Sequence, residues 1–250
     1  MNQEIPVNLT KQAEERTHDI TMSSIDYEIK INNTALIPYL AWQNTIREHY
    51  TGIMPEENTP EFDIFLKNPP YGTSNVSTLN MGLQVNHKLN NFLLGKNKIT
   101  LCAEYIYDNV LDEIPAYQYI IDQKTKNFGS FIQSDWEINN KINILSGLRM
   151  DKHNFVENII LSPRVSLLYK ENKNIQLRLN YGKGFRAPQA FDTDLHITFA
   201  GGGISRITLD PDLKPEFSQS ISSSINYDKP MKKSIAGFTV ESFYNKLTNS

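Results

Sequence analysis

Apolar and polar residues alternate with a period of two along most of this chain. In residues 175–186, Ile175 and Leu177 share one parity, and Gln176 and Arg178 share the other. A β-strand turns successive side chains to opposite faces, so this pattern predicts strands with one apolar face and one polar face. The same alternation is found in residues 128–138 and 161–170.

Applied to the whole sequence, the pattern predicts about ten strands and few helices. The strands are expected at residues 17–31, 35–47, 76–90, 98–110, 126–138, 142–150, 159–169, 175–186, 217–228 and 235–247. The connections between them are about 3, 28, 7, 15, 3, 8, 5, 30 and 6 residues long in chain order. Short and long connections therefore alternate without a break.

This alternation separates two classes of all-β fold. In an up-and-down antiparallel sheet, odd-numbered connections lie at one end and even-numbered connections at the other. A soluble β-sandwich has water at both ends and no reason to sort its loops, whereas an outer-membrane barrel has short periplasmic turns and long external loops. The sequence thus predicts an all-β fold, an antiparallel up-and-down transmembrane β-barrel whose polar face lines a wet lumen.

Aromatic residues near the predicted strand ends fit the aromatic girdles of such a barrel. They are Tyr27, Tyr105, Tyr107, Trp136, Tyr169, Tyr181, Tyr227 and Tyr244. Ordinary β-propensity explains any single one of them equally well.

Composition narrows the function classes. The 250 residues include 25 basic and 28 acidic side chains, and the net charge of −3 gives no field that would recruit nucleic acid. Cys102 is the only cysteine, which excludes an intrachain disulfide and a cysteine-rich zinc site. No signal-peptide pattern opens the chain, and no window approaches the roughly 18 apolar residues of a membrane helix. A β-barrel needs no such window, because each of its strands is only half apolar.

The most motif-like stretch is YGKGFRAPQAFDTDLHITFAGGG, residues 181–203. A P-loop needs G-x-x-x-x-G-K-[ST], and a dinucleotide fingerprint needs a third glycine at the start of a helix. Neither pattern is completed after Gly182 and Gly184, and Pro188 blocks the interior of a helix. On a strand, glycines on the lumen face allow another backbone to come close.

Other candidate residues give weaker signals. The histidines, His18, His49, His87, His153 and His196, form no metal-binding motif, so each is expected to be a surface or interface residue. No catalytic residue, metal site or cofactor is predicted.

Three loop features stand out, and the first two have alternative roles. Asp192 and Asp194 either bind a cation or order a loop through Asx turns. Tyr117 and Tyr119 are expected on a loop, where they either contact a ligand or pack locally. Residues 49–75 are expected to form an external loop.

Four segments stand in order between Leu161 and Leu247: LSPRVSLLY, LRLNYGKGFRAPQAFDTDLHI, LDPDLKPEFSQSIS and FTVESFYNKL. Together they resemble the barrel of TonB-dependent outer-membrane receptors. The nearest resemblance is to Bacteroidetes-type receptors for siderophores, colicins or cobalamin. The residues that match the family motif, structural and facing the lumen and plug rather than catalytic, are Gly182, Gly184, Phe185, Arg186, Pro188, Leu213, Pro215 and Glu216.

The resemblance implies a barrel of about 22 strands whose lumen holds an N-terminal plug domain. It also implies active uptake of scarce ligands, such as ferric siderophores or cobalamin, with energy from the TonB complex. The implied partners are the plug of the same receptor, the TonB complex, a small-molecule or metal-chelate ligand and outer-membrane lipid. Residues 1–250 are expected to be a partial barrel domain in the bacterial outer membrane, with the signal peptide, plug and last strands outside them.

Two alternatives remain from the sequence. One is a passive porin-like channel of the outer membrane, which an upstream plug sequence would exclude. The other is a soluble β-sandwich that acts as a binding module. The identity of the ligand is not contained in any pattern found here.

Overall fold

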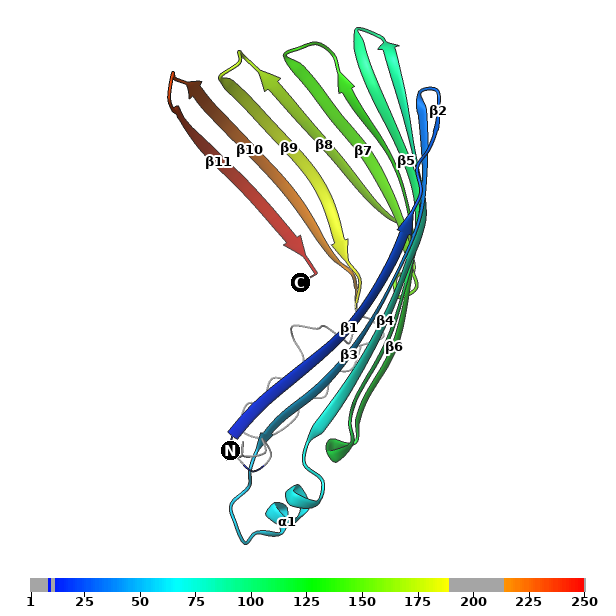
Figure 1. The fold of residues 1–250 in the computed structure, drawn as a ribbon, viewed down its shortest axis with the longest axis vertical. Coiled ribbons are helices and arrows are strands. Elements are labelled where there is room, and N and C mark those ends of the chain that lie inside the picture. Colours follow the sequence, from blue (N-terminus) through cyan, green and yellow to red (C-terminus); the bar gives the residue numbers. More distant parts are fainter. Residues whose placement is uncertain (1–8, 10–11, 189–213, 250) are drawn as a thin grey trace.

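The computed structural model describes residues 9, 12–188 and 214–249. These residues form one antiparallel sheet with the strand order β1-β3-β4-β5-β6-β7-β8-β9-β10-β11, and β2 pairs with β3 (Figure 1). The strands are β1 (Gln12–Asp26), β2 (Ile29–Ile31), β3 (Thr34–Ile53), β4 (Tyr71–Phe92), β5 (Gly95–Ile114), β6 (Tyr119–Glu137), β7 (Ile142–His153), β8 (Ile160–Lys170), β9 (Ile175–Arg186), β10 (Glu216–Pro230) and β11 (Ile235–Thr248). The prediction of an all-β up-and-down antiparallel sheet is confirmed, and the β-sandwich alternative is wrong.

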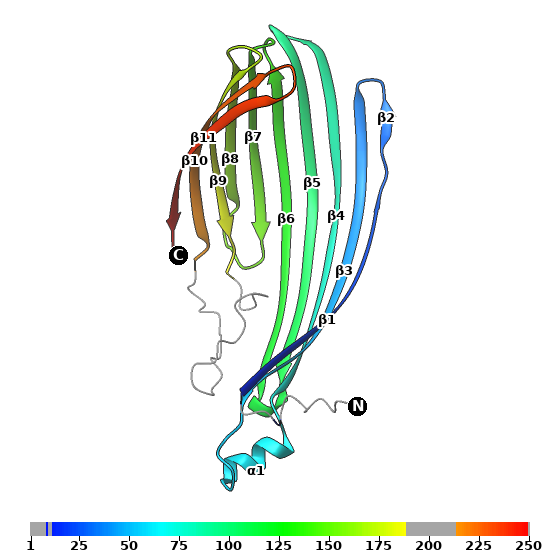
Figure 2. The same ribbon diagram turned by 60° about the vertical axis from the view of Figure 1, so that its left-hand side comes forward.

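Tight turns and longer connections lie at opposite ends of the sheet, as predicted. Tight turns at residues 93–94, 138–141, 171–174 and 231–234 lie together at one end (Figures 1 and 2). The connection that contains α1 (Pro60–Lys67) and the connection between β5 and β6 lie at the opposite end. We call the first end the turn end and the second the outer end.

Two regions predicted as loops are largely regular structure. Residues 111–125 were expected to be a loop, but β5 extends to Ile114 and β6 begins at Tyr119, with only a short 3₁₀ turn between them. The 49–75 region contains the end of β3, the helix α1 and the start of β4. These strand extensions lack a clean alternation of polar and apolar residues, which is why the pattern missed them.

The helix α1 carries start signals that were present in the sequence. Thr59 caps it, because its side-chain oxygen accepts a hydrogen bond from the Phe62 backbone at 3.2 Å. Pro60 occupies the first turn, and Lys67 lies in the last turn, as favoured by the helix dipole. In the part of the chain that is described, no helix is long and apolar enough to cross a membrane.

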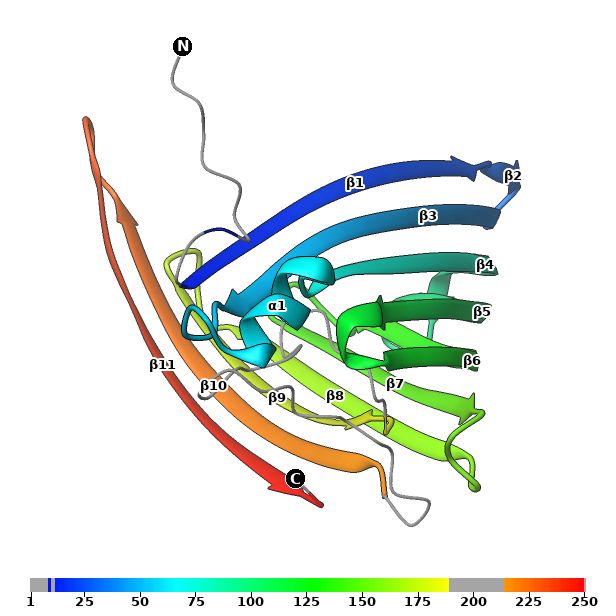
Figure 3. The same ribbon diagram turned by 90° about the horizontal axis from the view of Figure 1, so that it is seen from below.

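The two faces of the sheet differ in burial as well as polarity. Asp151, on the polar parity, is 1% exposed, whereas Leu101 and Ile132, on the apolar parity, are 46% and 51% exposed. Seen from below, the strands form an open arc (Figure 3). Side chains on the concave side of an arc converge and those on the convex side spread, so the polar parity forms the inner wall.

Two pairs of aromatic side chains of the outer face lie near the turn end. The rings of Phe92 and Trp136 meet edge to face with centroids 5.7 Å apart, and those of Tyr227 and Phe238 lie 5.5 Å apart. The tryptophan and tyrosine rings, with an apolar body and a polar tip, favour the boundary between membrane and water. Trp136 and Tyr227 are therefore placed as the sequence predicted for an interfacial girdle.

Candidate functional site

The family-motif residues of the sequence fall on two neighbouring strands. Gly182, Gly184, Phe185 and Arg186 lie in the last part of β9, and Pro188 follows the strand. Pro215 immediately precedes β10, and Glu216 is its first residue, whereas Leu213 lies outside the described residues. The register pairs Arg186 with Glu216 and Gly184 with Ser218. Two motifs separated in sequence are thus brought together at the outer end of one strand pair.

The inner wall carries a connected row of polar side chains. Tyr39 on β3 donates a hydrogen bond to Glu104 on β5 at 3.0 Å. Arg149 on β7 donates to the other oxygen of Glu104 at 2.6 Å and to Asp151 at 2.7 and 2.8 Å. Asn127 on β6 donates to Asp151 at 2.9 Å. We call Tyr39, Glu104, Asn127, Arg149 and Asp151 the inner-wall network.

Glycines make the network possible, because two of its contacts skip a strand. Tyr39 crosses β4 at Gly82, and Arg149 crosses β6 at Gly129. A Cβ at Gly82 would collide with the Tyr39 ring, and one at Gly129 would collide with the Arg149 guanidinium. A strand interior is otherwise unfavourable for glycine, so here the residue serves close approach.

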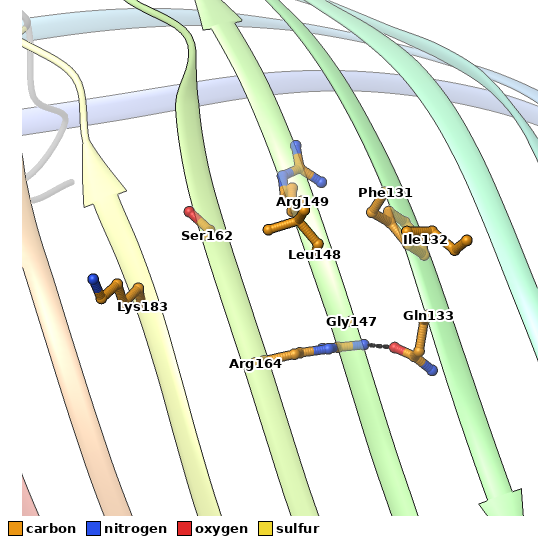
Figure 4. A pocket seen from close by; sticks show the side chains of 9 residues that line it. All are labelled: Phe131, Ile132, Gln133, Gly147, Leu148, Arg149, Ser162, Arg164 and Lys183. Atoms are coloured by element: carbon orange, nitrogen blue, oxygen red, sulfur yellow. Dashed lines mark hydrogen bonds between the residues drawn. The ribbon is translucent and has the colours of Figure 1, made fainter.

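A third crossing lies nearer β9. Arg164 on β8 reaches over Gly147 on β7 and donates to the side chain of Gln133 on β6 (Figure 4). A hollow of about 260 Å³ lies beside this contact. Its lining residues are Phe131, Ile132, Gln133, Gly147, Leu148, Arg149, Ser162, Arg164 and Lys183. Because the amide of Gln133 is neutral, this contact leaves the positive charge of Arg164 beside the hollow.

A buried charged cluster lies on the inner wall near the outer end. Asp112 on β5 is 3.7 Å from Arg47 and 3.5 Å from His49, both on β3, and all three side chains are at most 5% exposed. Burial lowers the pKa of Arg47, and the opposite charge of Asp112 counteracts it. A buried carboxylate is tolerated only with such partners, so the cluster fixes β3 against β5 across β4.

An apolar cluster adjoins these charges. It consists of Val110, Ile114, Tyr119 and Ile121, with Val76 and Tyr117 packed against it. Burial raises the pKa of the Tyr119 phenol to about 12, with a smaller contribution from Asp112. The local-packing interpretation of Tyr117 and Tyr119 is therefore correct, and Tyr119 belongs to a strand rather than a loop.

For two histidines the surface alternative is wrong. His49 and His153 were expected to be surface or interface residues, but they are 5% and 9% exposed. His49 is held by the cluster at Asp112, and the His153 ring packs against Phe155 with centroids 5.7 Å apart. Among the described residues, no group of three or more His, Cys, Asp or Glu side chains could hold a metal ion. His196, Asp192 and Asp194 lie outside the described residues.

The family model of the TonB-dependent receptor-like β-barrel matches residues 8–250. The chain belongs to this family. No curated protein matches it by sequence. Receptors of this family are transport proteins rather than enzymes and lie in the outer membrane, so both predictions are confirmed. The Bacteroidetes-type subgroup stays a prediction.

Solved structures of receptors share the fold of this TonB-dependent receptor chain. The ferric enterobactin receptor of Pseudomonas aeruginosa aligns with a TM-score of 0.70 at 18% identity, over 93% of this chain and 35% of that one. The siderophore receptor of Acinetobacter baumannii gives 0.68 at 15% identity, over 93% and 35%. The hemophore receptor of Serratia marcescens, in complex with its hemophore and heme, gives 0.69 at 13% identity, over 94% and 40%.

The chain thus spans about a third of the length of the receptors in the first two comparisons. TonB-dependent receptors work with a plug domain, with TonB and with small ligands such as siderophores or heme.

Sequence reasoning missed the inner-wall network. It singled out glycines only in β9, although Gly82, Gly129 and Gly147 occupy the same parity in β4, β6 and β7. A glycine at an inner-wall position of a strand is a signal that a long side chain from the neighbouring strand crosses it. The pairing partner of each glycine depends on strand register, which the sequence did not provide.

Proposed function

We propose that the receptor containing this barrel segment imports a scarce ligand of the ferric-siderophore type by TonB-dependent active transport. In this proposal the inner wall of β3–β10 surrounds a plug domain of the same receptor. The ligand class draws on the solved relatives that bind ferric enterobactin or take up heme with a hemophore. A cobalamin-like ligand, which the sequence resemblance also suggested, has no such support among the relatives named above.

The observation that carries the proposal is the open space at Gly182. A side chain of the sheet itself fills the space above Gly82 and Gly129, so the barrel accounts for those glycines. At Gly182 the nearest atom to an added Cβ is Arg164 Cβ, at 3.9 Å, which is ordinary contact. The packing of the described sheet therefore does not require glycine there, and close approach from the lumen explains it.

Charge on the inner wall supports the same arrangement. Arg149 is neutralised by Glu104 and Asp151, so it stiffens the wall rather than attracting a partner. Arg164, the register partner of Gly182 on the neighbouring strand β8, reaches away from β9 and contacts a neutral amide on β6. An acidic or carbonyl-rich surface that enters the lumen over β6–β8 would meet this guanidinium.

The test is uptake of a radiolabelled ferric siderophore by cells that carry the complete receptor, with and without a functional TonB. Active transport predicts that uptake is lost in the strain without TonB. Equal uptake in the two strains would indicate a passive porin-like channel and would overturn the proposal.

A substitution at Gly182 tests the plug-facing role separately. Gly182→Leu is expected to leave the amount of receptor in the outer membrane unchanged but to lower uptake, because the added side chain occupies space that the plug needs. Ser223→Leu is the control, since it adds the same side chain on the outer parity of β10, away from the lumen. Normal uptake by Gly182→Leu would contradict the proposal that the plug approaches the barrel at Gly182.

A further inference from the structure

The lipid-facing side of the sheet has a hollow between β4 and β7. Its floor is formed where Ala103 on β5 pairs with Ser130 on β6, two small residues side by side. On the two sides of this pair, Leu83 on β4 pairs with Ala103, and Met150 on β7 pairs with Ser130. The hollow measures about 340 Å³, a size typical of small-molecule sites, and its walls are mostly apolar.

Residues above the hollow change from apolar to cationic toward the outer end. On β6 the outward-facing positions after Ser130 are Phe128, Lys126 and Lys124. Phe128 is 53% exposed, and both lysines are exposed. Four residues of strand rise about 13 Å, so Lys126 lies about that distance from the floor of the hollow.

The two neighbouring lysines, Lys152 and Lys124, already have partners within the protein. Lys152 on β7 donates to the backbone carbonyls of Val156 and Glu157 at 3.1 and 2.5 Å. Lys124 is 3.8 Å from Asp122. Lys126 is exposed and lies on β6 between Lys124 and Phe128, the register partner of Lys152, which makes it the best-placed cation for a ligand above the hollow.

An apolar hollow, an aromatic ring and a lysine in one column match the parts of an anionic lipid. An acyl chain fills an apolar hollow, the ring favours the interface, and lysine near a membrane surface attracts phosphate. We propose that the outer face of β4–β7 binds a phosphorylated lipid of the outer leaflet, with one acyl chain over Ala103 and Ser130 and the phosphate at Lys126. This site is separate from the inner wall and independent of the transported ligand.

The experiment is native mass spectrometry of the complete receptor, titrated in detergent with diphosphoryl lipid A. Ala103→Leu fills the hollow and displaces about two acyl methylenes, so lipid A should bind about tenfold more weakly. Lys126→Gln removes one phosphate contact and should weaken binding about fivefold. Lys126→Arg keeps the charge and should restore binding.

Matched controls lie on the outer face of β11, far from the hollow. Ala236→Leu and Lys246→Gln repeat the two substitutions there and should leave lipid A binding unchanged. The zwitterionic lipid phosphatidylethanolamine, which lacks net charge, should bind wild type and Lys126→Gln equally. A wild-type receptor that binds both lipids equally, or control variants that lose as much binding as the test variants, would overturn the proposal.

Folding of each variant is checked by heat-modifiable migration in SDS gels before the titration. Ala103→Leu adds apolar surface on the lipid-facing side, where it suits the membrane. If this variant does not fold, Ser130→Val narrows the same hollow from the opposite strand and gives the same prediction. Unchanged lipid A binding by a folded hollow-filling variant would exclude the acyl-chain site.

Discussion

Toward the turn end the sheet places its apolar side chains on the outer face, whereas the outer ends of β5 and β6, which we call the outer extension, bury theirs on the inner face. Toward the turn end, outward-facing residues such as Val165 and Ile225 are apolar and 47% and 46% exposed, while the inner parity is mostly polar. At the outer ends of β5 and β6, the buried apolar side chains Val110, Ile114 and Ile121 lie on the inner parity. The face that carries the apolar side chains therefore differs between the two regions.

The difference follows from what surrounds each half. A tilted strand crosses the bilayer in roughly 9–11 residues, and β5 and β6 are 20 and 19 residues long. Within the membrane, lipid takes the apolar side chains of the outer face. Beyond it, both faces of the sheet meet water, so apolar side chains can be buried only against one another on the concave side.

A charge on the outer face is expected to have the largest effect. Ile225→Lys, toward the middle of β10, places an ammonium in hydrocarbon and should cost about 2–4 kcal/mol of folding free energy. Ser224→Lys, its neighbour on the inner wall, should cost less than about 1 kcal/mol because the side chain reaches a wet lumen. Urea titration of the complete receptor in lipid vesicles measures both variants. Equal costs would mean that the outer face of β10 does not contact lipid.

In the outer extension, a substitution on the inner face should cost more stability than one on the outer face, and the cost should be slightly smaller than that of Ile225→Lys. Ile121→Ala removes a side chain that is 7% exposed and should cost about 2–3 kcal/mol of local stability. Ile120→Ala, which is 61% exposed, should cost less than about 0.5 kcal/mol. Hydrogen exchange of the β5–β6 backbone amides measures the difference. Faster exchange in Ile120→Ala than in Ile121→Ala would show that the extension buries its outer face.

The smallest effect is expected at the glycines of the inner wall. Gly129→Ala forces the flexible Arg149 side chain to move and weakens its contact with Glu104, at a cost of about 1 kcal/mol. Gly182→Ala meets only ordinary contact at 3.9 Å and should leave the stability of the barrel unchanged. The thermal midpoint of the unfolding of each receptor variant checks this. A larger drop in the thermal midpoint for Gly182→Ala than for Gly129→Ala would show that the added methyl group is crowded on β9 and not on β6.

The sequence predicted the strands where alternation is clean, and it failed where alternation stops. The predicted segment 175–186 matches β9, because Ile175 and Leu177 face lipid while Gln176 and Arg178 face the lumen. It could not predict the extension from Val110 to Ile121, where Asp112 lies among apolar residues on the same face. A buried charge breaks the pattern, and its partners Arg47 and His49 are distant in sequence.

The period-two pattern by itself determined the class of fold, the sorting of turns and loops, and the lumen parity of Gly182 and Gly184. These properties depend only on local side-chain direction and on the contrast between lipid and water. Only the tertiary structure decided which side chains meet: Tyr39 with Glu104, Arg149 with Asp151, and Arg186 opposite Glu216. Such contacts depend on the register of strands far apart in the chain, which a one-residue shift would change entirely.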